Sequence, residues 1–272
     1  MNIHLFHIFY NEASKLSIPP GSIGLDNTNP EADGWYEFLP MIRKLNEIDL
    51  YSDDLIGFLS PNFHLKVGIT VPEFRRIAEE NYDRHDVFIS NYCWDQTAFF
   101  FNAWEQGEFW HPGISQSSQA FFDFINSGIL ITSLVGHARN TVASNFIIAK
   151  SSYWRKWLDM STLFLKFLNE DPVGLGLKAM STSYAAEHNQ QRMAVFIQER
   201  FASFLLSTTD FSTYVVDGDL KKPIFERLFK NTDSNRIILN ACDLIKRRYS
   251  VTGDQELLSA WRSLRSAVER AF

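Results

Sequence analysis

Three apolar runs in the first ninety residues, each broken by polar residues, constrain the fold of this chain most strongly. The runs cover residues 3–9, 55–59 and 86–90. Buried strands end in this way where they leave a sheet. Apolar residues at helical spacing follow the first two runs. Thr70 and Glu73 have the capping-box spacing that is typical of the start of a helix. The pattern predicts an α/β protein with a Rossmann-like central sheet flanked by helices.

The rest of the chain divides into a longer α/β part and a helical end. With 272 residues, 45% of them hydrophobic, the chain has enough apolar material for one large core. A further apolar run covers residues 145–149, and helical patterns cover residues 35–45, 70–82, 153–164 and 190–206. We therefore expect an α/β domain over residues 1–216 and an all-α carboxy-terminal extension, residues 217–272, packed on it.

The charge distribution bears on the partners of the protein. Its 26 basic and 32 acidic residues give a net charge of −6, which offers no general attraction to a phosphate backbone, so nucleic acid is not an expected partner. Basic residues concentrate after residue 217, either as a solvated helix face or as a surface for an anionic membrane. The amino terminus lacks the pattern of a signal peptide, and no apolar run reaches the length of a membrane helix, so we expect a cytoplasmic protein.

Metal ligands and common cofactor motifs are sparse. Cys93 and Cys242 are far apart in sequence and are expected to be buried thiols rather than a disulfide or a metal site. The histidines are scattered, and the chain has no glycine-rich phosphate loop. Asp217 and Asp219 have the spacing of a divalent-cation site, but Gly218 between them favours a tight turn. We therefore expect no cofactor and do not favour a divalent metal.

Polar side chains follow the apolar runs at the points where the strands would end. Tyr10 and Asn11 follow the first run, and Ser60, Asn62 and Lys66 follow the second. The carboxyl ends of strands are where α/β proteins bind ligands, and these side chains suit a base, a ribose and a diphosphate. The sequence therefore predicts a ligand site at this edge of the sheet.

The order of several segments resembles that in small bacterial glycosyltransferases of capsule and O-antigen gene clusters. Among them are Leu25-Asp26-Asn27, the run Ile-Gly-Phe-Leu-Ser-Pro-Asn-Phe at residues 56–63, and His111-Pro112. The other matching segments are residues 35–39, 145–150 with the tryptophan-rich helix after them, and 192–200. The resemblance covers about residues 1–210 in order. It implies a GT-A-like fold and transfer of a sugar from a nucleotide-sugar donor onto a growing glycan.

The same resemblance assigns positions to the donor. It implies that Tyr10, Asn11, Asp26 and Asn27 meet the nucleoside. Residues 60–62 fall where GT-A enzymes keep a metal-binding pair of acids, and this chain has Ser-Pro-Asn there. We therefore expect transfer without such a metal site, in which Lys66 or an arginine neutralises the leaving diphosphate.

Sugar transfer with inversion needs a base that takes the proton of the acceptor hydroxyl. We expect Asp95 in this role, with Glu187 as the second choice, because the Trp94 indole beside Asp95 would stack on a sugar face. The alternative role of Asp95 is to cap the helix that follows it.

A polar cluster precedes the apolar run at residues 145–149. It consists of His137, Arg139, Asn140 and Asn145. With Trp94, these residues are candidates for contact with the acceptor or with a phosphate, and ordinary loop polarity is the alternative.

Other functions stay open on the sequence alone. A non-catalytic carbohydrate-binding or scaffold protein would share the same fold. A sugar-phosphate or nucleotide hydrolase would need a cluster of metal ligands, which the sequence does not show. If the acceptor is a lipid-linked glycan, the basic extension would hold the enzyme at the inner membrane, whereas packing of its apolar residues on the sheet domain is the competing expectation.

Overall fold

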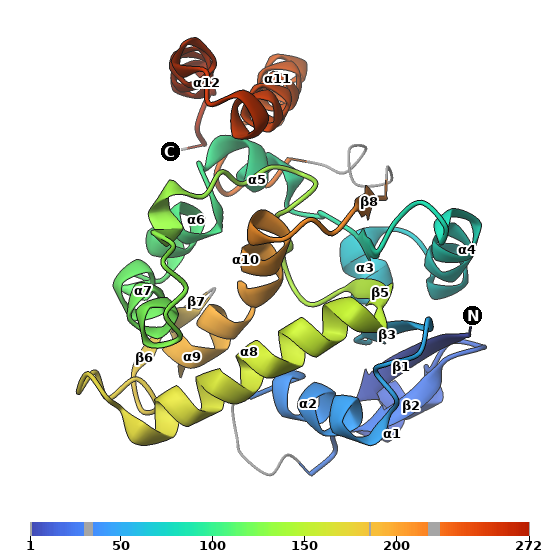
Figure 1. The fold of residues 1–272 in the computed structure, drawn as a ribbon. Coiled ribbons are helices and arrows are strands. Elements are labelled where there is room, and N and C mark those ends of the chain that lie inside the picture. Colours follow the sequence, from blue (N-terminus) through green and yellow to red (C-terminus); the bar gives the residue numbers. More distant parts are fainter. Residues whose placement is uncertain (1, 30–34, 185, 217–223, 272) are drawn as a thin grey trace.

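A mixed sheet organises the structure (Figure 1). The computed structural model describes residues 2–29, 35–184, 186–216 and 224–271, without the side chains of residues 183–189. Within these ranges, six strands form one sheet with helices against it. The α/β class and the Rossmann-like arrangement predicted from the sequence are therefore confirmed.

Five strands of this sheet run in one direction and one runs against them. The order is β2 (Ile23–Asp26), β1 (Ile3–Phe9), β3 (Leu55–Leu59), β5 (Ile147–Lys150), β4 (Val87–Ile89) and β8 (Thr213–Val215). Strand β5 is antiparallel to both of its neighbours, and the other pairs are parallel. The chain forms β2 on one side of β1 and then β3 on the other. The topological switch point, where α/β sheets bind ligands, therefore lies between β1 and β3.

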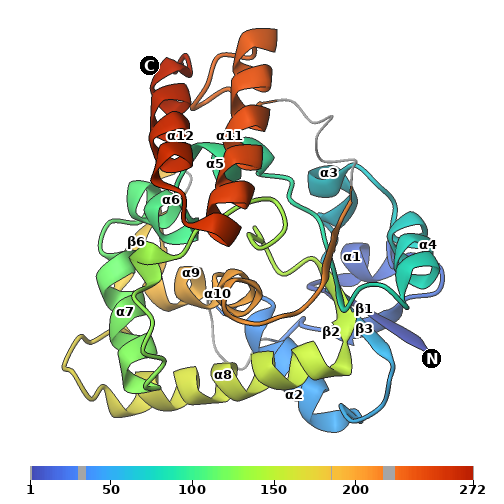
Figure 2. The same ribbon diagram turned by 45° about the horizontal axis from the view of Figure 1, so that its top comes forward.

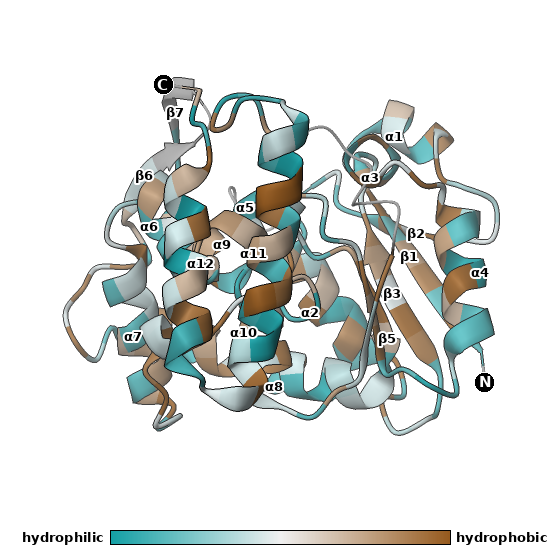
Figure 3. Ribbon diagram, turned by 90° about the horizontal axis from the view of Figure 1, so that it is seen from above, coloured by the Kyte–Doolittle hydropathy of each residue, from teal (hydrophilic) through white to brown (hydrophobic). Residues whose placement is uncertain are grey.

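Four of these strands match apolar runs in the sequence, and β2 and β8 were not predicted. Residues of β1 and β3 alternate between the two faces of the sheet, and both faces are buried. Phe6 and Phe58 pack under α2 (Phe38–Glu47) and α8 (Ser151–Glu170), whereas Leu5 and Leu59 pack under α3 (Phe63–Val67) and α4 (Val71–Asn81). Figure 3 shows α4 on one side of the sheet and α2 and α8 on the other. The Thr70 capping box starts α4 as expected.

The segment before the last sheet strand differs from its prediction. Strand β7 (Ala186–Arg192) pairs with β6 (Ser181–Tyr184) in a second, two-stranded antiparallel sheet. Helices α9 (Met193–Gln198) and α10 (Phe201–Thr208) follow, with Glu199 and Arg200 between them. The single helix expected over residues 190–206 is therefore wrong. Its apolar residues are buried in both helices, so the sequence pattern does not reveal the break.

The carboxy-terminal extension packs on a helix of the α/β part. Helices α11 (Asp233–Thr252) and α12 (Gln255–Ala267) pair with each other, and α11 lies against α5 (Trp94–Phe99) (Figure 2). Lys246 of α11 is buried and donates hydrogen bonds to the carbonyl oxygens of Thr97 and Phe100. The Trp261 indole donates to the carbonyl oxygen of Ala98 at 3.2 Å. Residues 217–219, expected to form a turn, lie outside the described residues.

Candidate functional site

Two adjoining cavities open beside the carboxyl ends of the parallel strands. The first cavity has a volume of about 330 Å³ and is lined by residues that follow both strands, so it lies at the switch point of the sheet. The second cavity, of about 190 Å³, lies beside it toward α5 and α6 (Ala103–Trp110). Four residues line both cavities and form what we call the shared wall: Lys66, Ser144, Phe196 and Glu199.

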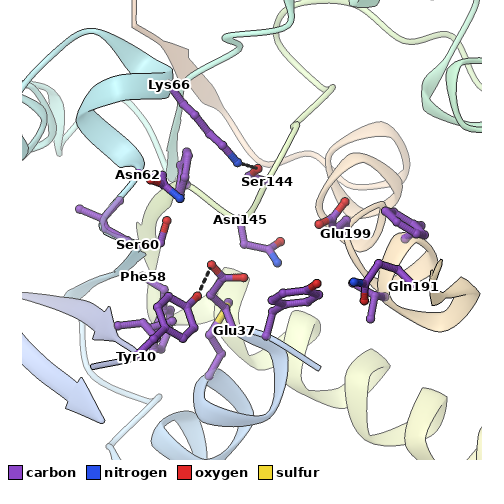
Figure 4. A pocket seen from close by; sticks show the side chains of 17 residues that line it. Tyr10, Glu37, Phe58, Ser60, Asn62, Lys66, Ser144, Asn145, Gln191 and Glu199 are labelled. Atoms are coloured by element: carbon purple, nitrogen blue, oxygen red, sulfur yellow. Dashed lines mark hydrogen bonds between the residues drawn. The ribbon is translucent and has the colours of Figure 1, made fainter. Parts of the chain in front are cut away.

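Tyr10 and Glu37 form a hydrogen-bonded pair in the first cavity (Figure 4). The Tyr10 hydroxyl donates to Oε1 of Glu37 at 2.6 Å. Burial, followed by the nearby Glu37 carboxylate, raises the pKa of Tyr10, so this phenol remains a hydrogen-bond donor. The adjacent Tyr36 has a left-handed backbone (φ 46°), and its carbonyl oxygen accepts a hydrogen bond from Asn27 Nδ2 at 2.9 Å. Asn27 therefore holds Tyr36 and Glu37 at the cavity.

Lys66, on α3, supplies a cation to the shared wall. Its Nζ lies 5.6 Å from the ring centres of both Tyr92 and Phe146, and 3.5 Å from Oγ of Ser144. It forms no ion pair with a carboxylate in the part of the chain that the structure describes. Aromatic rings hold the ammonium group without neutralising it, so it can interact with an anionic ligand.

Glu199, which follows α9, supplies a carboxylate to the same wall. Burial raises its pKa to about 7; Arg200 and Lys66 oppose this effect, and Glu37 adds to it. Its carboxylate accepts no hydrogen bond within the described ranges. A partly accessible carboxyl group with this pKa can exchange a proton with a ligand at neutral pH.

Arg200, next to Glu199, is occupied by the protein itself. Nε donates to the carbonyl oxygen of Ala103 at 3.0 Å, Nη1 to that of Phe196 at 2.6 Å, and Nη2 to Oε1 of Gln106 at 2.9 Å. The guanidinium group lies against Gly107, where a Cβ atom would stand 2.6 Å from Nη2. Arg200 therefore fixes the junction of α9 and α10 against α6.

The structure brings together five of the residues predicted to contact ligand. Tyr10, Ser60, Asn62, Lys66 and Asn145 all line the first cavity. Figure 4 shows Asn145 between the Tyr10–Glu37 pair and Glu199. Asn145 was expected on the acceptor side, and its Nδ2 donates to Oε1 of Gln198 at 3.4 Å. Tyr10 and Ser60 directly follow buried strands, and Asn145 closely precedes one, so the rule for strand ends locates these positions at the cavity.

Two other predicted donor residues have local roles. Oδ1 of Asn11 accepts from the Ser14 amide at 2.8 Å and caps α1 (Glu12–Leu16). Asp26 accepts from the amide and the hydroxyl of Thr28, both at 2.8 Å, and these bonds lower the pKa of Asp26. Neither residue lines the first or the second cavity.

The residue favoured as the base, Asp95, lies outside both cavities. Its carboxylate is buried and accepts from the backbone amides of Gln96 at 2.8 Å and Phe225 at 2.6 Å. Burial raises its pKa, although the two amides oppose this. Asp95 therefore ties the start of the extension to the first turn of α5, a geometry that does not favour its role as base. Glu187 lies in β7, and its side chain is not described.

Most of the predicted acceptor cluster also lies elsewhere. Trp94 and Arg139 line a third cavity, between β8 and α11. Asn140 accepts from the His137 amide at 2.7 Å and donates to the carbonyl oxygen of Val135 at 2.9 Å, which closes a turn. Burial lowers the pKa of His137 to about 3, and the nearby cations Lys246, Arg247 and Arg139 add to the effect. These contacts agree with the alternative of ordinary loop polarity.

Three residues that supply polar groups used by the two cavities were not predicted from the sequence: Glu37, Gln96 and Glu199. Glu37 and Glu199 lie in or beside helices, and Gln96 lies in α5, so none of them follows a strand. The one local signal for Glu199 was an acid within a long apolar run.

The described residues hold no group of three or more histidine, cysteine, aspartate or glutamate side chains placed to bind a metal ion. No helix in the described ranges has the length and apolar character needed to cross a membrane. Comparison of the chain with family models, with known proteins and with solved structures gives no match.

Proposed function

We propose that this protein is a glycosyltransferase that moves a sugar from a nucleotide-sugar donor to a glycan acceptor. The observation that carries the proposal is the position of the first cavity at the switch point between β1 and β3, with Lys66 and Glu199 on its wall. Nucleotides bind α/β sheets at such a point. The transfer reaction needs both a cation and a base there.

The donor would occupy the first cavity. Tyr10 and Tyr36 offer aromatic surface and a hydroxyl group to the nucleoside, and Ser60 and Asn62 lie where its phosphates would begin. The Lys66 ammonium would balance the charge that develops on the leaving diphosphate. This role needs no acidic pair at residues 60–62, where the chain has Ser-Pro-Asn.

The reaction is a single displacement. The oxygen of an acceptor hydroxyl forms a bond to the anomeric carbon while the bond from that carbon to the diphosphate oxygen breaks, and its electron pair leaves with the nucleoside diphosphate. The hydroxyl proton passes to the Glu199 carboxylate, and the anomeric configuration inverts. With a pKa of about 7, Glu199 is largely ionised just above neutral pH and still basic enough to accept a proton.

The finer assignments belong to the same proposal. They are a GT-A-like variant of the Rossmann-like sheet and a role in bacterial surface polysaccharide synthesis. The proposal also includes a cytoplasmic location with peripheral contact to the inner membrane. They rest on the resemblance of the segments in residues 1–210.

Release of nucleoside diphosphate from a panel of UDP-, GDP- and dTDP-sugars tests the proposal. We expect slow release by the wild type, lowered about a hundredfold in Glu199→Gln, as for loss of a general base. Glu80→Gln is the matched control and should retain the wild-type rate, because Glu80 forms only an exposed ion pair with Arg76 on α4. Binding of a sugar nucleotide without any release would indicate the non-catalytic alternative, and no binding across the panel would refute the proposal.

A further inference from the structure

We infer that the second cavity binds the acceptor as an uncharged sugar unit, held by Gln96 with a hydroxyl directed at Glu199. This inference rests on the proposed function, because it places the acceptor on the opposite side of the shared wall from the donor. The two cavities have Lys66, Ser144, Phe196 and Glu199 in common. A ligand in each would therefore meet at the Glu199 carboxylate.

Gln96 presents an unused hydrogen-bond donor to this cavity. Its Oε1 accepts from Nε2 of Gln106 at 3.0 Å and from the Trp110 indole at 3.1 Å. An indole nitrogen can only donate, so these contacts fix the orientation of the Gln96 amide. The residue is 6% exposed, and its Nε2 donates to no group in the described residues. This amide group can donate to an acceptor oxygen, which a sugar hydroxyl can supply.

The network behind Gln96 holds it in place. Gln106 donates to Gln96 and accepts from Arg200, and Arg200 is anchored on the carbonyl oxygens of Ala103 and Phe196. These contacts connect α5, α6 and the junction after α9. The free Nε2 group therefore belongs to a preorganised wall, as expected for a binding site rather than for a loop surface.

The charges on the wall indicate an uncharged ligand. Apart from Glu199, the permanently charged side chains that line the second cavity are Lys66 and Arg200. Arg200 uses all three guanidinium nitrogens within the protein, and Lys66 is assigned to the diphosphate. An anionic acceptor would face the Glu199 carboxylate, which favours an uncharged ligand. Thr97, Thr141 and Phe196 complete a lining that suits the polar edge and apolar face of a sugar.

Saturation-transfer NMR with a panel of methyl glycosides, in the presence of UDP, tests the inference. The panel consists of methyl glucosides, galactosides, mannosides and N-acetylglucosaminides of both anomers. We expect a signal from at least one glycoside, with affinity about tenfold lower in Gln96→Glu, which keeps the acceptor for Gln106 and Trp110 but removes the donor. Ala143→Leu, which adds bulk at the cavity wall, should give a similar loss. Gln255→Glu, at an exposed residue that begins α12, is the matched control.

Affinity for UDP, measured by calorimetry on each variant, should stay within about twofold of the wild type if the two cavities are separate subsites. Absence of a signal from every glycoside, or signals unchanged in both cavity variants, would overturn the inference even if sugar nucleotides are bound and cleaved. Glycoside binding without nucleotide binding would instead refute the proposed function and leave the sugar site standing.

Discussion

Replacing Glu199 with glutamine should change how stability depends on pH, whatever the protein catalyses. The carboxyl group has a pKa of about 7 in the folded protein, against an ordinary value of 4.5. Between these values the folded protein holds a proton that the unfolded chain has released. The free energy of unfolding of the wild type therefore falls as pH rises through this window. Glutamine cannot titrate, so the variant lacks this loss.

The two pKa values set the size of the effect. The difference between the pKa values in the folded and unfolded states corresponds to about 3 kcal/mol in the free energy of unfolding when the group is fully shielded from solvent. Because Glu199 is partly exposed at the cavity, we expect about 2 kcal/mol between pH 5 and pH 8. The sign is definite: the free energy of unfolding of Glu199→Gln minus that of the wild type should be larger at pH 8 than at pH 5.

Urea unfolding of both proteins at pH 5 and pH 8 measures this difference. Glu73→Gln is the control, because the hydrogen bond from the Thr70 amide lowers the pKa of Glu73 and both states are then mostly ionised over this range. Its stability relative to the wild type should stay nearly constant. A constant difference for Glu199→Gln as well would refute the argument that burial raises the pKa of Glu199.

Three further substitutions test the surrounding assignments. Lys66→Met should weaken nucleoside diphosphate binding about tenfold in calorimetry, because the shared wall loses its cation; unchanged affinity would place the phosphates elsewhere. Asp95→Asn should lower the free energy of unfolding by about 2 kcal/mol, because an amide cannot accept from both Gln96 and Phe225; a fully stable variant without turnover would instead support Asp95 as the base. Burial lowers the pKa of Lys246 to about 7, so wild-type stability should rise between pH 7 and pH 9.5, and Lys246→Met should remove that rise; equal slopes would contradict the assignment.

The sequence predicts the central sheet because its strands are buried on both faces. Strands β1, β3, β4 and β5 are nearly continuous apolar runs, which short strands between two helical layers require. Strand β2 has a glycine and mostly exposed residues at the sheet edge, so its sequence carries little signal. Strand β8 has three partly buried residues.

The candidate site is predictable only where its residues adjoin a strand. Tyr10 and Ser60 follow strands directly, so the rule for strand ends locates them. Glu199 and Gln96 reach the site through contacts between distant segments, such as that of Arg200 with Ala103, and local patterns do not encode such contacts. The bond from the Phe225 amide to Asp95 was not predictable for the same reason, since the two residues lie 130 positions apart in the sequence.

A crystal structure with UDP, GDP or dTDP bound tests the central claim most directly. We expect the nucleoside beside Tyr10 and Tyr36 in the first cavity, and the diphosphate within hydrogen-bonding distance of Lys66 Nζ (about 3 Å). The terminal phosphate should point toward the shared wall that carries Glu199. A nucleotide in the third cavity, beside Trp94 and Arg139, or a first cavity left empty at saturating nucleotide, would contradict the account.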